Sequence, residues 1–474
     1  MMRIRAEIRW PMAALVALVL GFAEAAGAQS LVEVARQADR EVLAALVERG
    51  EDVTVRSGDG TSALHWASYW DDVEAAEMLI VAGADVNAAN DLGATPLWPA
   101  ALNGSSEMVR LLLSAGADAR AALLSGETLV MTAARSGNPD VVEQLLRKGG
   151  DPNGSATRGQ TALMWAVAQR HADVVALLLE HGADVHARSD VWKQYWQTDG
   201  GEVVHPELRI WIDHGGNTPL LFAAHNGDLE SAKLLVAAGA DVEAEAAYGI
   251  NAAVYAVHSG NNELLEFLLE QGTDPSAAAA GYSALHAALL RRNPGAVRLL
   301  LEHGADPNAP LATTTPTRRA SSDFYFHPAY VGATPFWLAA RFSQPDAMRL
   351  LAEHGADPHF VHDVDYWAST GIFTGFNRDT QGETTALMAA VGMGGGRGFV
   401  APAREERERL MLEAVAIAAD LRIDVNAVNA NGASAADAAA AAGFQSVVDF
   451  LIARGARPPV PAPRRTRPEE TDDQ

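Results

Sequence analysis

The chain has 474 residues, 49% of them hydrophobic and 20% charged, a balance that excludes a largely disordered protein. Its formal net charge of −24 disfavours nucleic acid and anionic lipid as partners, and the absence of cysteine excludes disulfides, cysteine-bound zinc and thiol catalysis. Aromatic residues make up only 7%, and Ala and Leu carry most of the hydrophobic content. Such a composition favours close-packed short helices, so we expect an all-α fold.

The N-terminus has the order of a secretory signal peptide. Three arginines, at positions 3, 5 and 9, precede an apolar run over 11–22, and small residues follow up to Ala28. We expect cleavage after Ala28 and a periplasmic or secreted protein with a net charge of −25, since residues 1–28 hold three Arg and two Glu. The alternative is an uncleaved membrane anchor, for which the run is short. No later segment predicts a membrane span.

The rest of the chain repeats itself with a period of 33 residues. One short pattern reads TPLWPA from Thr95 and TALMWA from Thr161, and a second, in phase with it, reads Gly83-Ala84-Asp85. Between them, apolar residues follow the i, i+3, i+4 spacing of a helix face. Each unit is therefore a turn, two short helices, a Gly that ends the second helix, and an extended loop. The first pattern begins at Ser62, Thr95, Thr128, Thr161, Thr218, Asn251, Ser283, Thr334, Thr385 and Ser434.

These phrases resemble the ankyrin repeat family, whose consensus joins TPLHxAA to LLxxGADxN. Residues 218–244 match it closely, and the resemblance extends over about 30–458. It implies a secreted, bacterial-type member built as an all-α solenoid of about ten helix-turn-helix units with an N-terminal capping unit. Its extended loops would project as fingers beside a concave face, where family members usually hold partners.

The repeat register divides the chain into consecutive segments. We expect a signal peptide at 1–28, an N-terminal capping repeat at 29–56, repeats 1–4 at 57–190, an aromatic insertion at 191–214, repeats 5–7 at 215–309, an insertion at 310–331, repeat 8 at 332–361, an insertion at 362–382, repeat 9 with an inter-helix insertion at 383–428, a C-terminal capping repeat at 429–458 and a disordered tail at 459–474.

Most residues that could carry chemistry are explained by the repeat. His65 and His286 stand at the consensus TPLH position, and the aspartates that recur once per repeat are expected to form turns, because one repeat spacing is too long for a shared metal ion. A cluster of His354, His359, His362, Asp363 and Asp365 could hold a transition metal but lacks an HExxH pattern. We predict no catalytic residue, no metal and no cofactor.

Three insertions lie in the loops between repeats and are rich in aromatic residues. Windows 191–214, 310–331 and 360–382, which span them, hold 13 of the 31 Phe, Trp and Tyr residues of the chain. Large rings with a polar edge suit interface anchors, and the alternative is that they pack onto neighbouring repeats as satellite cores. The candidate partner-binding residues are Trp192, Tyr195, Trp196, Trp211, Phe324, Tyr325, Phe326, Tyr330, Tyr366 and Trp367.

A fourth insertion lies between the two helices of repeat 9, which places it on the edge away from the fingers. It contains a glycine-rich loop at 392–398 and the charged run 404–409, which predicts a lengthened second helix.

These observations favour a scaffold that binds an unidentified protein and is not an enzyme. A carbohydrate or small-ligand binder is the alternative, and a deep pocket lined by Trp192, Trp196 and Trp211 would favour it. An enzyme with a site built from the insertions is a third reading, which would require convergent titratable groups beside those rings.

Overall fold

The computed structural model describes residues 30–197, 209–313, 326–363, 382–395 and 403–460. Within these ranges the chain is mostly helical, and nearly every repeat contributes two short helices. The predicted signal peptide and almost all of the predicted disordered tail lie outside the described residues. The chain divides into two compact units.

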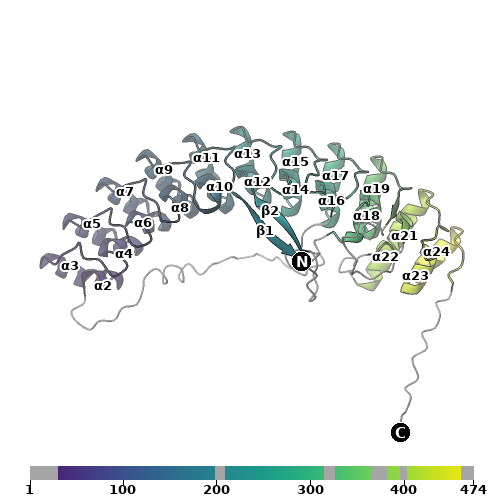
Figure 1. Ribbon diagram of the computed structural model, residues 1–474, viewed down its shortest axis with the longest axis horizontal. Helices are drawn as coiled ribbons and strands as arrows, with labels where there is room; N and C mark the ends of the chain where they lie inside the picture. Colours follow the sequence, from purple (N-terminus) through teal and green to yellow (C-terminus); the bar gives the residue numbers. More distant parts are fainter. Residues whose placement is uncertain (1–29, 198–208, 314–325, 364–381, 396–402, 461–474) are drawn as a thin grey trace, which may run out of the picture. The chain divides into compact units, whose positions relative to one another are not determined.

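The first unit comprises the chain up to Asp190 together with residues 218–223 and 230–240. Its helices form two rows, with the first helix of each repeat in one row and the second helix in the other (Figure 1). The first row contains α2 (Leu31–Arg36), α4 (Ala63–Tyr69), α6 (Leu97–Asn103), α8 (Leu129–Ser136) and α10 (Ala162–Gln169), and the second contains α3 (Arg40–Glu48), α5 (Val73–Val81), α7 (Ser106–Ser114), α9 (Pro139–Arg147) and α11 (Ala172–Glu180); a 3-10 turn, η1, spans Thr157–Gly159.

The second unit comprises residues 191–217, 224–229 and the chain from Asp241 onward. It has the same two rows (Figure 1). The first row contains α14 (Ala252–Ser259), α16 (Ala284–Leu290), α18 (Pro335–Arg341), α21 (Ala386–Ala390) and α23 (Ala435–Ala442), and the second contains α15 (Asn262–Glu270), α17 (Pro294–Glu302), α19 (Pro345–Glu353), α22 (Arg404–Asp420) and α24 (Gln445–Ala453); a 3-10 turn, η3, spans Pro328–Tyr330. Two helices, α12 (Pro219–Asn226) and α13 (Leu229–Ala237), contain residues of both units.

The turn residues of the repeat start and end the first-row helices as the sequence predicts. Thr128 lies in extended backbone, and its hydroxyl accepts the backbone N–H of Met131 at 3.2 Å, which satisfies a donor that the first turn of α8 leaves open. At the other end Gly137 adopts a φ of 85°, a left-handed conformation that costs glycine little. The residues that recur every 33 positions therefore mark where the helices begin and end.

Burial follows the predicted helix faces. On α17, Val297 and Leu300 have no exposed surface and Leu301 is 4% exposed. Small alanines of the first-row helices are equally buried, which allows neighbouring helices to approach closely. The core therefore runs between the two rows, from repeat to repeat, and each layer is completed by the next.

The loop tips between repeats are joined by backbone hydrogen bonds. In the first unit the amide of Asp91 donates to the carbonyl of Asp59 at 2.9 Å, and that of Leu124 donates to Leu92 at 2.9 Å. In the second unit Ala312 donates to Gly281 at 2.8 Å. Each tip is held by its neighbour, so these loops form an ordered edge.

Two insertions contain strands that the sequence analysis did not predict. Antiparallel strands β1 (Val191–Gln197) and β2 (Arg209–Gly215) form a hairpin in the first insertion. Two shorter strands, β3 (Val361–Asp363) and β4 (Glu383–Thr385), pair at the two ends of the third. The all-α class holds for the repeats themselves, because the hairpins are confined to inserted loops.

Candidate binding surface

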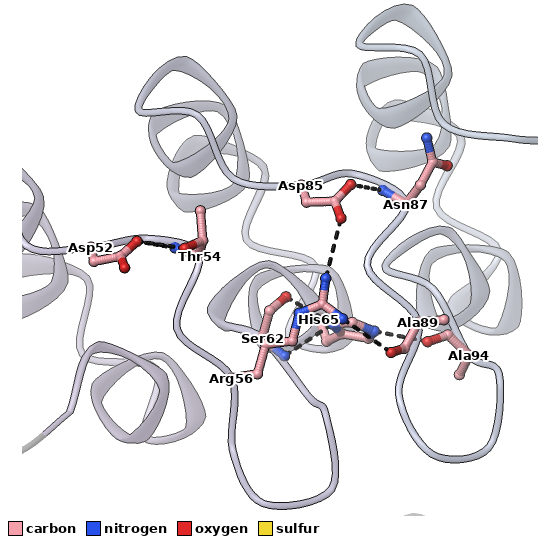
Figure 2. Close-up of polar contacts among 9 residues, drawn as sticks. All are labelled: Asp52, Thr54, Arg56, Ser62, His65, Asp85, Asn87, Ala89 and Ala94. Atoms are coloured by element: carbon pink, nitrogen blue, oxygen red, sulfur yellow. Dashed lines mark hydrogen bonds and ion pairs between the residues drawn. The ribbon is translucent and has the colours of Figure 1, made fainter.

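The consensus histidines have a structural role, as predicted. The ring Nδ1 of His65 accepts the backbone N–H of Ser62 at 3.1 Å, and its Nε2 lies 2.9 Å from the carbonyl oxygen of Ala94 in the next repeat (Figure 2). His286 repeats the first of these contacts with Ser283 at 3.2 Å. Each ring caps its own helix, and His65 also joins two repeats.

The recurring aspartates form turns, also as predicted. The Asp85 carboxylate accepts the backbone N–H of Asn87 at 2.9 Å, and its second oxygen lies 3.2 Å from a guanidinium nitrogen of Arg56 in the preceding repeat (Figure 2). Arg56 also donates to the carbonyl of Ala89 at 3.4 Å. The same turn recurs between Asp52 and Thr54 (Figure 2). The motif residues are occupied in holding the repeats together.

The candidate metal cluster is not assembled. His354 Nδ1 lies 2.8 Å from its own helix carbonyl at Leu350, and His362 Nε2 lies 2.7 Å from the carbonyl oxygen of Ala329. Asp365 lies outside the described residues, and among those that the structure describes no group of three or more His, Cys, Asp or Glu side chains could hold a metal ion.

The hairpin of the first insertion has two different faces. Its register pairs Trp192 with His214 and Gln194 with Ile212, and Ile212 is 6% exposed. The rings of Trp192 and His214 stack with centroids 5.8 Å apart. Because neighbouring residues of a strand face opposite sides, Trp211 lies on the other face, where it is 65% exposed.

This arrangement bears on the predicted anchors and on the carbohydrate alternative. Trp192 and Trp211 cannot line one pocket, since they occupy opposite faces of the hairpin. Trp211 is largely exposed at the surface, whereas the half-buried Trp192 packs within the hairpin. The side chains of Tyr195 and Trp196 lie outside the described residues.

The described rings of the second insertion belong to the core. Phe326 has no exposed surface and Tyr330 is 2% exposed, so neither ring is offered to a partner. Phe326 packs against Tyr282 and His286, with centroids 6.1 and 6.2 Å away. For these two residues the structure has the satellite-core arrangement, because insertion and repeats bury more apolar surface together. The remaining candidates, Phe324, Tyr325, Tyr366 and Trp367, lie outside the described residues.

The bases of three insertions converge on α18. Trp337, which is fully buried, takes the consensus histidine position and donates its Nε1–H to the carbonyl of Thr384 at 3.2 Å, beside the edge of the His362 ring. Arg341 is 7% exposed, donates to the carbonyl of Gly395 at 2.8 Å and lies over the ring of Tyr330. We call the three α18 residues Trp337, Leu338 and Arg341 the closed stretch.

The first residues of the fourth insertion pack on α18: Gly395 accepts a hydrogen bond from Arg341, and a side chain at Gly394 would collide with the ring of Trp337. Residues 396–402 of this insertion lie outside the described residues, so its placement on the edge away from the fingers stays a prediction. The large flat ring leaves room only for glycine backbone at this point. The predicted lengthened helix is confirmed as α22, which has 17 residues.

Toward α12 and α14 the same face of the second unit is open. His225 is exposed at the end of α12, Tyr255 and His258 on α14 are half-buried, and Tyr248 is half-buried at a loop tip. The rings of His225 and Tyr255 meet edge to face at 5.3 Å, and the Tyr255 hydroxyl donates to Asn217 at 3.2 Å. We call His225, Tyr248, Tyr255 and His258 the open stretch.

Burial sets the ionisation of the open stretch. It lowers the pKa of His258 to about 4, an effect to which the charges of Arg291 and His225 add. It raises the pKa of Tyr248 and of Tyr255 above the ordinary value. At neutral pH His258 is therefore an uncharged imidazole, and both tyrosines keep their hydroxyl protons.

The open stretch was not predicted from the sequence, although a signal was present. The histidines considered there were His65 and His286 of the TPLH phrases and those of the cluster at 354–362. His225 and His258 instead stand seven residues after Thr218 and Asn251, at equivalent positions of consecutive repeats. A polar ring repeated at one position of adjacent first-row helices indicates a shared surface.

The architecture and the comparisons agree on the class of this protein: a solenoid of stacked two-helix repeats. Models of the family described as ankyrin repeats in three copies match residues 31–122, 116–189 and 220–311, and a single ankyrin repeat matches 331–363. Together they cover more than half of the chain, which therefore belongs to the ankyrin repeat family. Ankyrin repeats are protein-interaction scaffolds and are generally not enzymes.

Individual proteins match part of the chain. Ankyrin repeat and SAM domain-containing protein 6 of Mus musculus and that of Rattus norvegicus are each 35% identical over 85 residues, which is 18% of this chain and 10% of the relative. The chain thus spans about a tenth of these relatives. The crystal structure of the human ASB11 ankyrin repeat domain is 27% identical, with a TM-score of 0.41, and the match covers 50% of this chain and 96% of that domain.

Proposed function

We propose that this protein binds a partner protein through the first-row face of its second unit, at the open stretch and the neighbouring β1–β2 hairpin. The observation that carries the proposal is the contrast along this face: rings are available at α12 and α14, whereas insertion bases bury the equivalent positions at α18. Aromatic rings with polar edges suit a binding surface that is exposed to water when the partner is absent.

The exposed Trp211 extends this surface onto the hairpin. The base of the hairpin is tied to the open stretch, since Gly215 accepts the amide of Ala247, next to Tyr248, and Asn217 accepts the Tyr255 hydroxyl. Tyr195, Trp196, Phe324, Tyr325, Tyr366 and Trp367 remain proposed anchors on the inserted loops.

The test compares baits in affinity capture from an envelope extract of the source cells, quantified by mass spectrometry. Baits that carry Tyr255→Ala or Trp211→Ala should each fail to retain a partner protein that the unaltered chain captures. Val81→Ala is the control, because Val81 is 83% exposed on a second-row helix of the other unit. Equal retention by all four baits would contradict the proposal.

We also propose that the protein works in the periplasm or outside the cell, on the basis of the signal-like residues 1–28. Within the described residues, none of the helices combines the length and the apolar character needed to cross a bilayer. N-terminal sequencing of the mature protein should begin at Gln29. A chain that begins at Met1 in the membrane fraction would support the anchor instead.

A further inference from the structure

The outer edge of β2 has backbone groups that point away from β1. The carbonyl of Gly215 accepts the amide of Ala247, in the next loop tip, at 3.0 Å, so it faces away from β1. Because successive residues of an antiparallel strand point their backbone groups to alternate sides, those of Arg209, Trp211 and Asp213 face the same way. Among the described residues, none outside the hairpin forms a backbone hydrogen bond with Asp213. At Asp213 the edge is therefore open to a further strand.

The two edges of the hairpin differ in how they are protected. Proteins prevent unwanted pairing at sheet edges with lysines, prolines and bulges. The outer edge of β1 has such a guard, since Lys193 is exposed there. Residues 209–213 of β2 contain neither Lys nor Pro, and their register against β1 is free of bulges. A two-stranded sheet with one unguarded edge gains stability when another strand is added to that edge.

The unguarded edge reads Arg-Ile-Trp-Ile-Asp, a sequence that is complementary to itself. Two copies can run antiparallel with Trp211 of each at the two-fold axis. Ile210 of each copy then lies opposite Ile212 of the other, and Arg209 of each lies opposite Asp213 of the other. Aromatic, aliphatic and opposite-charge pairs are the ones that stabilise neighbouring strands. The strand that fits this edge best is therefore a second copy of β2.

The bond to Ala247 also favours this register. A two-fold axis at Ile212 would place Arg209 of one copy opposite Gly215 of the other, and the outward carbonyl of Gly215 is already bonded to Ala247. With the axis one residue earlier, the pairing needs only residues 209–213 of each copy. The bond between the hairpin base and the next loop tip is then left intact.

We propose that two copies of the chain associate through the outer edges of β2, so that their hairpins form one four-stranded sheet with Trp211 at its two-fold axis. Three residue pairs would exchange two backbone hydrogen bonds each, about six in all. The contact is isologous, and the guarded β1 edges lie at the two outer sides of the sheet, so assembly stops at the dimer. This inference goes beyond the proposed function, because it concerns a contact of the chain with itself.

Sedimentation of the full chain measures the association. A five-residue strand contact between chains of net charge −24 predicts a weak dimer, which should form within about 1–100 µM protein. Arg209→Asp places a carboxylate opposite Asp213 of the second copy and should weaken the dimer at least about tenfold. Arg298→Asp, an equal charge change at an exposed position of α17, is the control. A monomer throughout this range, or a dimer that Arg209→Asp leaves unchanged, would overturn the proposal.

Introduced cysteines test the register, since the chain has none of its own. At the two-fold axis the Cα atoms of the paired residues lie about 5.5 Å apart, within reach of a disulfide. Trp211→Cys should therefore give a covalent dimer under mild oxidation. Asp213→Cys is the matched control, because the two thiols would be four strand positions apart, roughly 14 Å. Equal cross-linking of the two variants would contradict an axis at Trp211.

Self-association and partner capture can fail separately. Pairing through the strand edge leaves the Trp211 rings of both copies on one face of the sheet, so the dimer is compatible with the proposed partner surface. Tyr255→Ala should leave the dimer intact although it should lose the partner, since Tyr255 lies on α14 and outside the β2 edge. A dimer that captures no partner would contradict the proposed function alone. Loss of the dimer on Tyr255→Ala would overturn the β2 contact.

Discussion

The open and closed stretches occupy equivalent positions of the same repeat pattern in the same unit. His258 on α14 and Arg341 on α18 each stand seven residues after the first residue of their TPLH phrase, yet His258 is half-buried and Arg341 is 7% exposed. Tyr255 and Leu338 differ in the same way, since Leu338 has no exposed surface. Repeat position alone therefore does not decide whether a side chain is surface or core. The adjacent insertion decides it.

The largest expected effect is on the closed stretch. Trp337→Ala removes a fully buried ring and its hydrogen bond to Thr384, so it should lower the free energy of unfolding by about 3–5 kcal/mol. Denaturant titration measures this loss. Hydrogen exchange should rise first in the repeats around α18, because each layer depends on its neighbours.

Trp211→Ala is the matched control for that variant. It removes the same side chain from a 65% exposed position, so it should change stability by less than about 0.5 kcal/mol. Similar losses from both variants would contradict the distinction between packed and exposed insertion rings.

The difference between these tryptophans also shows how far the sequence could predict the molecule. The repeats were predictable because each one restates the same local pattern, from the Thr128 cap to the buried face at Leu300. The closed stretch was not, because it depends on contacts between residues far apart in the chain, such as Trp337 and Thr384. No pattern within 33 residues encodes which inserted loop covers which helix.

A second prediction concerns the pH dependence of stability and uses His286 on α16. His286 is fully buried against Phe326, and burial lowers its pKa from about 6.5 to about 4. The unfolded chain therefore takes up a proton near pH 6.5 that the folded chain accepts only near pH 4. The free energy of unfolding should fall through that window, by about 2–3 kcal/mol between pH 7 and pH 4.5 from this group alone.

Comparison with a non-titrating variant isolates that contribution. Denaturation of His286→Gln at the two pH values should show a loss smaller by about 2–3 kcal/mol than that of the unaltered chain. Identical pH profiles for the unaltered chain and His286→Gln would show that the ring titrates normally and is not sealed.

The smallest expected effect is the most informative about function. Tyr255→Phe keeps the ring and removes the hydroxyl that donates to Asn217, and the side chain is only half-buried, so stability should change by less than about 1 kcal/mol. Affinity for a captured partner should nevertheless fall by about 0.5–1.5 kcal/mol, the usual net value of one hydrogen bond. Calorimetry of the purified pair measures the affinity, and thermal unfolding measures the stability. A variant that loses stability but binds its partner normally would make Tyr255 a packing residue of α14. The open and closed stretches would then differ in how tightly their side chains pack, and the open stretch would have no role in partner binding.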